Sequence, residues 1–341
     1  MFTTAEIFGS VTITQTKHSQ KSKMLNFYQL LRLCPMKSNS KLTMKKNKNI
    51  LNLLIFLFIF IIMLISSCED TPPTDYVPQY YVEAFLIVDQ PIDMIKLLRT
   101  QPLQDSFRLS KALVKDATVK IRFNNQEITL AFRDTGNLDN WAYFYPDTSL
   151  KVLPNTQYEL EITTPDNVKI TGTTITPERF EWVIPPPDSL FYPKDTTKFS
   201  DRKPAKIKWS PVKNMLYYLL VTKCLDSLEY GKYLVPPSNE KNRRVFNPFD
   251  NERRRTRDYY DLSLWDAIPN VEYEIYWLLF KWFGKHKIIV FAPDYNFLRW
   301  VLQQFRANQI NPLLSSVNGA IGVFGSASKI EKEIFLFKNQ P

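Results

Sequence analysis

Residues 117–132 read ATVKIRFNNQEITLAF, and they carry the clearest structural pattern in the chain. Apolar side chains alternate with polar ones on both sides of the Asn124-Asn125 pair. A period of two is that of a strand with one buried face, and asparagines tolerate the positive φ angles of a tight turn. The stretch therefore predicts a β-hairpin.

Similar runs extend in both directions from this hairpin. Further strands are predicted at residues 81–88, 95–99, 141–145, 158–163 and 168–176. Short strands separated by turn residues, with no helical stretch among them, are typical of a β-sandwich. We expect an Ig- or transthyretin-like β-sandwich over residues 80–176.

A second unit is expected from Pro177 to the end of the chain, over residues 177–341. A strand ending at Trp209, a turn at Lys213-Asn214 and an apolar strand over residues 216–224 resemble the B and C strands of a fibronectin type III domain. Residues 271–283 predict the strongest strand, with apolar side chains on both faces toward its end.

One helix is predicted in this second unit, at about residues 294–308. Asp294 is a suitable N-cap, and an apolar stripe follows it. The stripe consists of Phe297, Trp300, Val301, Leu302 and Phe305, with Arg299, Gln303 and Arg306 opposite. The predicted fold is therefore mainly β: an N-terminal sandwich, then a fibronectin type III-like domain with one packed C-terminal helix.

The N-terminal end has the pattern of a lipoprotein signal. Three lysines precede an apolar run over residues 53–65, and Ser66-Ser67-Cys68 ends it. A run of this length is shorter than the roughly 20 residues of a spanning helix, which favours a signal peptide at residues 44–67 over an uncleaved anchor. Branched apolar, small, small, Cys is the bacterial lipobox, so Cys68 is the predicted lipidation site.

The leader is already complete from Met44. We therefore interpret residues 1–43 as a mis-assigned or disordered extension, the alternative being an unusually long presequence. Residues 68–79 are acidic and contain proline, as expected of an extended tether.

Most of the basic character lies in this leader. Residues 1–67 hold nine of the 44 Lys and Arg residues and one of the 34 Asp and Glu residues, so the net charge of +10 falls to +2 without them. A nucleic-acid partner, which selects a basic domain, is not expected. Of the three cysteines, only Cys224 remains beyond Cys68 and its leader, so no internal disulfide is expected and Cys224 is interpreted as a core residue.

Several stretches together resemble one protein family. They are the lipobox at Cys68, residues 82–84 with 86–88, residues 98–102, residues 114–119, residues 158–160 and residues 317–325. Over most of residues 68–328 the chain is similar to the Bacteroidetes lipoproteins grouped as domain of unknown function 4249. The resemblance implies an envelope lipoprotein, often considered alongside outer-membrane TonB-dependent transporters, and it implies no reaction.

No pattern of catalytic or metal-binding residues stands out. His286 is the only histidine after the leader and is interpreted as part of a solvated turn, which argues against a Ser-His-Asp triad and a zinc site. Asp134, Asn137 and Asp139 could ligate calcium, but an ordinary polar hairpin is favoured. We expect no enzymatic activity, no cofactor and no metal.

Two other groups of residues are of interest. Gly319, Gly322 and Gly325 do not match a nucleotide-binding motif and are interpreted as sites of close backbone approach. Among the tryptophans, Trp209, Trp277 and Trp300 fit core positions. A sugar-stacking platform would have to come from Trp141, Trp265 or Trp282.

The strongest surface candidate is an arginine-rich loop between residues 241 and 257. Arginines interleaved with aromatic residues can bind phosphate or carboxylate groups. The candidate binding residues are Arg243, Arg244, Arg253, Arg254, Arg255 and Arg257. A solvated loop with internal ion pairs is the competing interpretation.

These observations predict a lipid-anchored outer-membrane protein on the periplasmic or cell-surface face. Its expected role is non-enzymatic, as a binding or accessory component of an outer-membrane transport system, with a TonB-dependent transporter as partner or a glycan or peptide as ligand. The alternatives are a structural envelope lipoprotein and, less favoured, a hydrolase acting on glycan or peptide.

Overall fold

The structure is a computed structural model of the whole chain. It describes residues 76–102, 106–193, 205–225, 230–233, 235–239, 263–275, 277–306 and 312–338. Within these ranges, no helix is long and apolar enough to cross a membrane.

A six-stranded sheet contains the predicted hairpin. Its order is β15-β7-β6-β3-β4-β5. The strands are β3 (Thr118–Phe123), β4 (Gln126–Arg133), β5 (Ala142–Phe144), β6 (Gln157–Thr163), β7 (Lys169–Ile175) and β15 (Val317–Asn318). Asn124 and Asn125 join β3 to β4 with φ angles of 46° and 61°, which confirms the predicted hairpin and its turn.

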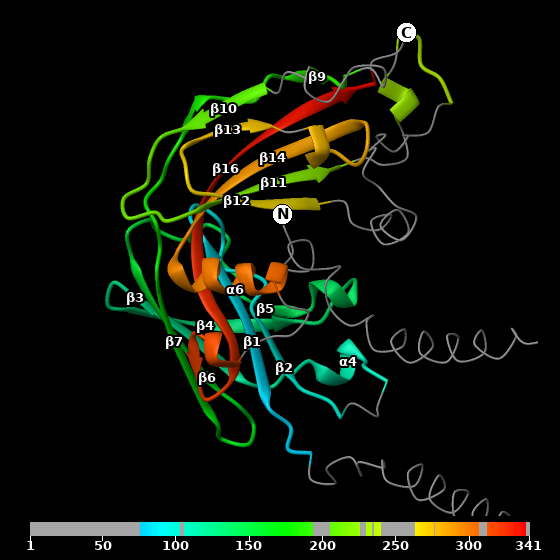
Figure 1. Ribbon diagram of the computed structural model, residues 1–341. Coiled ribbons are helices and arrows are strands. Elements are labelled where there is room, and N and C mark those ends of the chain that lie inside the picture. Colours follow the sequence, from blue (N-terminus) through cyan, green and yellow to red (C-terminus); the bar gives the residue numbers. More distant parts are fainter. Residues whose placement is uncertain are drawn as a thin grey trace, which may run out of the picture. The chain divides into compact units, whose positions relative to one another are not determined.

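A seven-stranded sheet forms the centre of the fold (Figure 1). Its main path is β12-β11-β14-β16-β1-β2, and β9 also pairs with β16. The strands are β1 (Tyr80–Ile87), β2 (Lys96–Arg99), β9 (Ser189–Phe191), β11 (Tyr218–Cys224), β12 (Ser263–Ile268), β14 (Gly284–Pro293) and β16 (Ile321–Phe337). The 17-residue strand β16 pairs in parallel with β1 through its first half and antiparallel with β14 through its second.

A three-stranded sheet completes the structure. It has the order β13-β10-β8, formed by β8 (Trp182–Ile184), β10 (Ala205–Trp209) and β13 (Glu272–Ile275). This sheet packs on β11, β14 and the second half of β16 around a core that includes Trp209, Leu220 and Leu336. β10 and β11, the predicted B and C strands, lie in opposite sheets of this sandwich, as the fibronectin type III arrangement requires.

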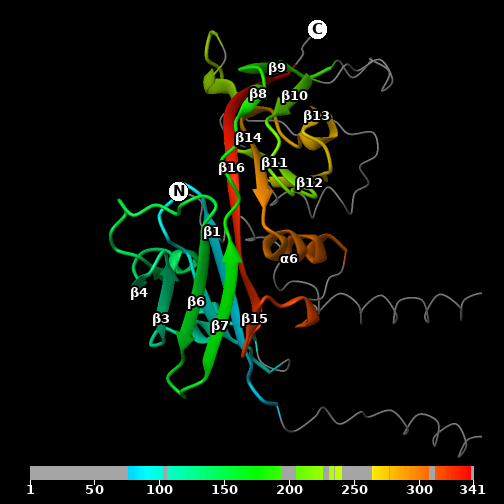
Figure 2. The same ribbon diagram turned by 90° about the vertical axis from the view of Figure 1, so that its left-hand side faces the viewer.

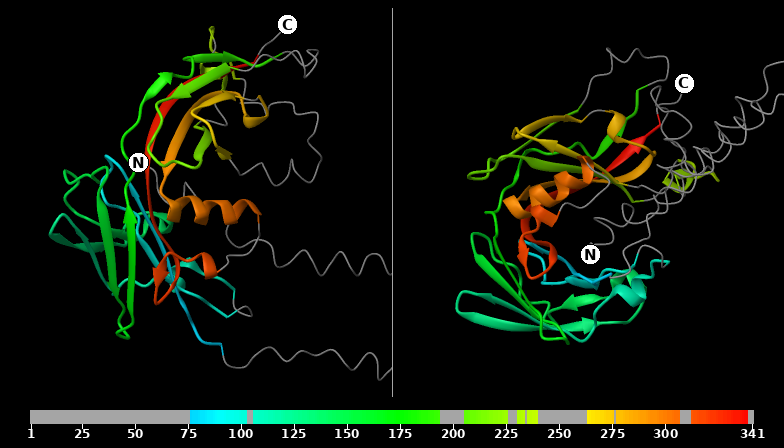
Figure 3. Two further views of the ribbon diagram at one scale, coloured as in Figure 1. Left: turned by 60° about the vertical axis from the view of Figure 1, so that its left-hand side comes forward. Right: turned by 60° about the horizontal axis from the view of Figure 1, so that its bottom comes forward.

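Each sandwich has its own core, and both use strand β16 (Figure 3). The first core lies between the six-stranded sheet and strands β1 and β2, but it also contains Val317 and Phe324 from the C-terminal part of the chain. Residues 80–176 therefore share their core with residues 317–324, across the domain boundary that the sequence indicates at Pro177.

Helix α6 (Tyr295–Arg306) covers the seven-stranded sheet on the side opposite the six-stranded sheet (Figure 2). The backbone N–H of Phe297 donates to Asp294 Oδ1 at 2.8 Å, which confirms the predicted cap. Phe297, Trp300 and Val301 are buried against β11, β14 and β16, as predicted. Gln303, expected on the polar side, is buried instead because the helix is covered on more than its apolar stripe.

The strand predicted over residues 271–283 is confirmed only for Glu272–Ile275 and is wrong beyond it. β13 ends at Ile275, and a 3-10 turn, η4, covers Trp277–Leu279. A 3-10 turn places side chains three residues apart on one side, and both Trp277 and Phe280 enter the second core in this way. The continuous apolar run therefore comes from a buried turn that follows the strand. It does not continue the two-residue period of a strand.

The remaining short helical elements lie in connections. They are α4 (Leu109–Ala112), η1 (Leu138–Asn140), η3 (Tyr230–Tyr233) and η5 (Pro312–Leu314). α4 falls within residues 80–176, where the sequence analysis expected no helix, because a single helical turn is too short to show a 3.6-residue period.

Candidate binding sites at the two ends of strand β16

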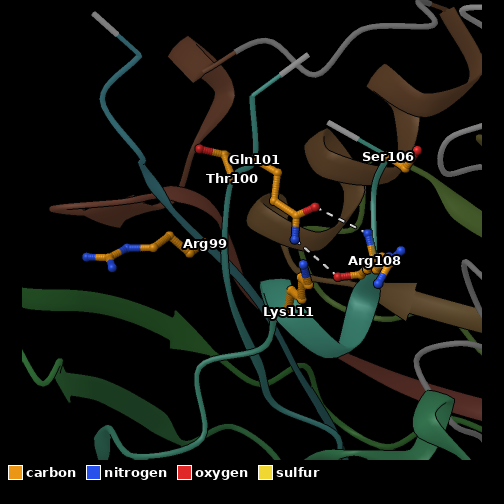
Figure 4. Close-up of a pocket in the computed structure, with 6 residues that line it drawn as sticks. All are labelled: Arg99, Thr100, Gln101, Ser106, Arg108 and Lys111. Carbon is orange, nitrogen blue, oxygen red and sulfur yellow. Dashed lines mark hydrogen bonds between the residues drawn. The ribbon is translucent and has the colours of Figure 1, made fainter. Parts of the chain in front are cut away.

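A polar pocket lies beside the start of β1 and the end of β2 (Figure 4). The chain enters the fold here, because Gln79 and Thr100 are joined by two hydrogen bonds of 2.9 Å, one between the two backbones and one to the Thr100 hydroxyl. The pocket has a volume of about 460 Å³, and its described lining consists of Arg99, Thr100, Gln101, Ser106, Arg108 and Lys111.

The side chain of Gln101 shapes this pocket. Its Nε2 donates to the Arg108 carbonyl at 3.1 Å, and its Oε1 accepts from the Arg108 backbone N–H at 3.2 Å. This two-bond clamp fixes the start of α4 beside the end of β2, as the dashed lines in Figure 4 show. Arg108 and Lys111 are therefore held on one side of the pocket by backbone contacts that leave their charges exposed.

The three cations of the pocket differ in their partners. Arg99 turns away from the other two and donates to Asp166 Oδ2 at 2.8 Å and to the Tyr80 hydroxyl at 3.1 Å. Hydrogen bonds from Thr164 and Tyr80 lower the pKa of Asp166, which keeps that carboxylate charged and Arg99 neutralised. Within the described ranges, Arg108 and Lys111 have no acidic partner within 4.0 Å. The pocket is therefore suited to an anion.

An aromatic cluster lies at the other end of β16. Phe337 of β16 stacks on Phe191 of β9 with ring centroids 5.0 Å apart, and Phe335 lies 4.5 Å from Phe337. Phe191 is 62% exposed, although Leu190 and Leu336 beside it are buried in the second core. The alternation of both strands directs these phenylalanines away from Leu190 and Leu336. Phe335 and Phe337 are half-buried, and Phe335 also packs against the edge of the second core. We call Phe191, Phe335 and Phe337 the aromatic end cluster.

Further apolar side chains are exposed near this cluster in the chain. Val183 and Ile184 of β8 are 56% and 48% exposed, on the edge of the three-stranded sheet. Three prolines, Pro185 to Pro187, separate them from β9 and cannot donate backbone hydrogen bonds to an added strand. This region is therefore better suited to side-chain contacts than to strand addition.

The binding and lipidation residues singled out from the sequence lie outside the described residues. These are Cys68 and the loop arginines Arg243, Arg244, Arg253, Arg254, Arg255 and Arg257. Their predicted roles stay predictions.

His286 is not part of a solvated turn, and this interpretation is wrong. It lies in β14, is 2% exposed, and is paired in register with Cys224 on one side and Ile334 on the other. Burial lowers the pKa of the imidazole to about 4, although the Gly284 carbonyl 2.9 Å from Nδ1 opposes this shift. Cys224 is buried beside it, as predicted.

The predicted polar hairpin and glycine contacts can be placed in detail. Asn137 Oδ1 accepts from the Asp139 backbone N–H at 3.3 Å and so caps η1, and no cluster of three or more potential metal ligands occurs in the described part of the chain. Gly319 and Gly322 have φ angles of 81° and 137°, and their Cα atoms approach the backbones of Lys169 and Val82. The prediction of close backbone approach is confirmed.

The tryptophans provide no exposed stacking platform among the positions the sequence proposed. Trp282 is buried, and Trp265 is half-buried against Phe291, with ring centroids 5.8 Å apart. Trp141 is also half-buried, and Lys115 Nζ lies 4.1 Å from its ring centroid. The core positions of Trp209, Trp277 and Trp300 are confirmed.

Sequence reasoning missed the anion pocket. Its only signals were the family-like stretch at residues 98–102 and the spacing of three between Arg108 and Lys111, which places both on one side of a helical turn. Neither signal reveals that Asp166, distant in sequence, neutralises Arg99, or that Arg108 and Lys111 have no acidic partner among the residues the structure describes.

Two β-sandwiches that share one long strand, with an anion pocket at one end and an aromatic cluster at the other, define a β-rich protein with surfaces suited to binding. The chain belongs to the family described as Domain of unknown function (DUF4249), whose model matches residues 69–333. This match confirms the family expected from the sequence, while the lipoprotein and Bacteroidetes character stay predictions. No curated protein matches the chain.

Proposed function

We propose that this protein is a non-enzymatic accessory lipoprotein of the bacterial outer membrane, anchored at Cys68 and bound to a protein of an outer-membrane transport system. The lipobox pattern at residues 65–68 supports the anchor, and the acidic, proline-containing residues after it are expected to form an extended tether between the anchor and the fold. A TonB-dependent transporter is the proposed partner, with a glycan or peptide as the transported ligand.

The single observation that carries this proposal is the aromatic end cluster. Phe191 is exposed, it stacks on the half-buried Phe337, and the exposed Val183 and Ile184 lie a few residues before it in the chain. Exposed apolar groups of this kind often mark a contact with another protein. Aromatic residues are also the side chains most enriched in protein–protein interfaces. The cluster is therefore a suitable contact for a protein partner.

Strand β16 separates this cluster from the anchor. Its first residue, Ile321, pairs with Tyr81, close to the point where the tether joins the fold. Seventeen residues at about 3.3 Å each span roughly 55 Å, so the cluster lies at the end of the strand that is remote from the tether. A partner that extends from the membrane plane could reach it there without displacing the anchor.

Site-specific photocrosslinking in the native host tests the proposal. A photoreactive p-benzoylphenylalanine replaces Phe191 in one strain and Tyr295, which is 64% exposed, in a matched control strain. We expect position 191 to crosslink to an outer-membrane transporter and position 295 not to. Crosslinks to no protein at position 191, or the same products at both positions, would contradict the partner. A Cys68→Ala variant with unchanged mass and location would contradict the anchor.

A further inference from the structure

We propose that the pocket side of α4 contacts the lipid surface itself, with Arg108 and Lys111 binding the phosphate groups of lipid headgroups. This inference rests on the proposed membrane anchor but not on the proposed protein partner. It assigns the anion pocket a ligand class and assigns the fold an orientation on the membrane.

The tether limits how far the pocket can lie from the bilayer. Gln79 is the eleventh residue after Cys68, and its backbone is fixed to Thr100 at the pocket by two hydrogen bonds. Eleven residues reach at most about 40 Å when fully extended, and less in any other conformation. The point where the tether joins the fold, beside the pocket, therefore lies within about 40 Å of the anchored cysteine, whatever path the tether takes.

The charges of the pocket differ from those on the sheet surfaces. On the outer face of the six-stranded sheet, cations pair with acids of neighbouring strands. Arg122 Nη1 lies 3.0 Å from Glu161 Oε2, and Lys169 Nζ lies 3.1 Å from the same oxygen. On β14 and β16, Lys287 pairs with Glu331 at 2.9 Å. These surfaces are locally neutral, whereas Arg108 and Lys111 are exposed without an acidic partner in the described ranges. Free cations near an anionic surface are attracted to it.

The neighbouring side chains also suit a headgroup layer. Ser106 carries a hydroxyl that can donate to phosphate oxygens on the pocket wall. Phe107, between Ser106 and Arg108, is 42% exposed, and aromatic rings are favoured at the boundary between headgroups and acyl chains. Arginine can bind one phosphate through two N–H groups, and lysine binds as a point charge.

Photocrosslinking from the pocket tests this contact. The full chain, carrying p-benzoylphenylalanine in place of Phe107, is reconstituted through its own anchor into vesicles of phosphatidylcholine with or without one-third phosphatidylglycerol. We expect a crosslinked adduct with the mass of one phosphatidylglycerol, and we expect R108E/K111E to reduce its yield at least tenfold. The matched control, K206E/K208E, reverses two exposed cations of β10 and leaves the yield unchanged.

Other outcomes separate the competing explanations. Loss of the adduct on adding 10 mM inorganic phosphate, but not equal ionic strength of chloride, would assign the pocket to a soluble phosphate and overturn the lipid contact. An adduct with a protein in native membranes would overturn it in favour of a second protein contact, while crosslinking at position 191 could still succeed. Failure of the chain to associate with any vesicle would instead refute the anchor of the proposed function.

Discussion

Acidification should destabilise this protein through one buried imidazole. His286 is 2% exposed inside β14, where its ring lies edge-on to Phe280 with centroids 5.2 Å apart. Burial lowers the pKa of His286 from 6.5 in a solvated chain to about 4. The folded state therefore disfavours the proton that the unfolded chain readily takes up below pH 6.5.

The sign and the size of the effect follow from this difference. Because the folded pKa is depressed, the stability is fully present above about pH 6.5 and is lost progressively as the pH falls toward 4. Between pH 7 and pH 5 the unfolding free energy should fall by about 2 kcal/mol, and the complete loss, reached below pH 4, is roughly 3 kcal/mol. For a protein of this size, 2 kcal/mol lowers the melting temperature by about 4 °C.

The assay is urea unfolding at pH 7, 6 and 5 for the wild type and for His286→Gln, which cannot titrate. Paired carboxylates such as Glu161 and Asp166 have lowered pKa values, so they stay charged in this window. Carboxyl groups with raised pKa values, such as Asp294, affect both proteins equally. The comparison uses the change in unfolding free energy with pH within each protein. A constant loss of stability caused by packing glutamine at position 286 therefore does not affect the result.

The expected result is a fall of about 2 kcal/mol in the wild type and a much smaller one in the variant. The only other histidine, His18, precedes Cys68 and occurs in both proteins unless the leader is removed. Equal pH dependence in the two proteins would refute the reasoning, because it would mean that the buried imidazole does not control stability in this range.

Three further substitutions test the packing around α6 and β16. Asp294→Ala removes the helix cap and the acceptor for Thr174 Oγ1 at 2.6 Å, and should lower the unfolding free energy measured by chemical denaturation by about 1–3 kcal/mol. Asp294→Asn keeps an oxygen acceptor and should lower it less. A larger loss for Asp294→Asn than for Asp294→Ala would argue against the cap. Gly322→Ala places a Cβ against the Val82 backbone at a φ of 137° and should lower the melting temperature by several degrees; an unchanged melting curve would show that β1 and β16 can separate freely. Trp300→Ala should cost about 3–5 kcal/mol, measured by calorimetry, because its side chain is fully buried against the sheet; a loss below 1 kcal/mol would mean that α6 does not pack as a stable cover.

Local patterns in the sequence were sufficient for the elements that depend on neighbouring residues. Alternation over residues 117–132 with Asn124-Asn125 between its halves predicts the β3–β4 hairpin, because side-chain period and turn angles are local properties. Asp294 followed by an apolar stripe predicts α6 for the same reason. The apolar segment at residues 53–65 and the lipobox also predict a membrane anchor without any tertiary information.

The identity of strand partners was decided by the tertiary structure. Tyr81 pairs with Ile321 near the opposite end of the sequence. The alternation of apolar and polar residues in β1 and β16 gives no indication that these two strands pair with each other. The same limit applies to His286 and to the turn at Trp277. His286 packs against Phe280, and Trp277 lies in the second core among residues distant in sequence, so local polarity is a poor guide to burial there.

The candidate sites show the same division. The sequence shows where phenylalanines and cations occur, but the folded structure decides which of them are exposed and which cations pair with acids distant in the chain. Asp166, in the β6–β7 turn, reaches Arg99, whereas no acidic side chain in the described part of the chain reaches Arg108 or Lys111. Composition and period thus indicated most of the strands and their buried faces, with the exceptions of residues 276–283, His286 and Gln303. Only the tertiary structure determined that strand β16 belongs to both sandwiches, with the anion pocket near its start and the aromatic end cluster at its end. The physical reason is that strand pairing uses hydrogen bonds between segments far apart in the chain, which leave no local pattern in the sequence.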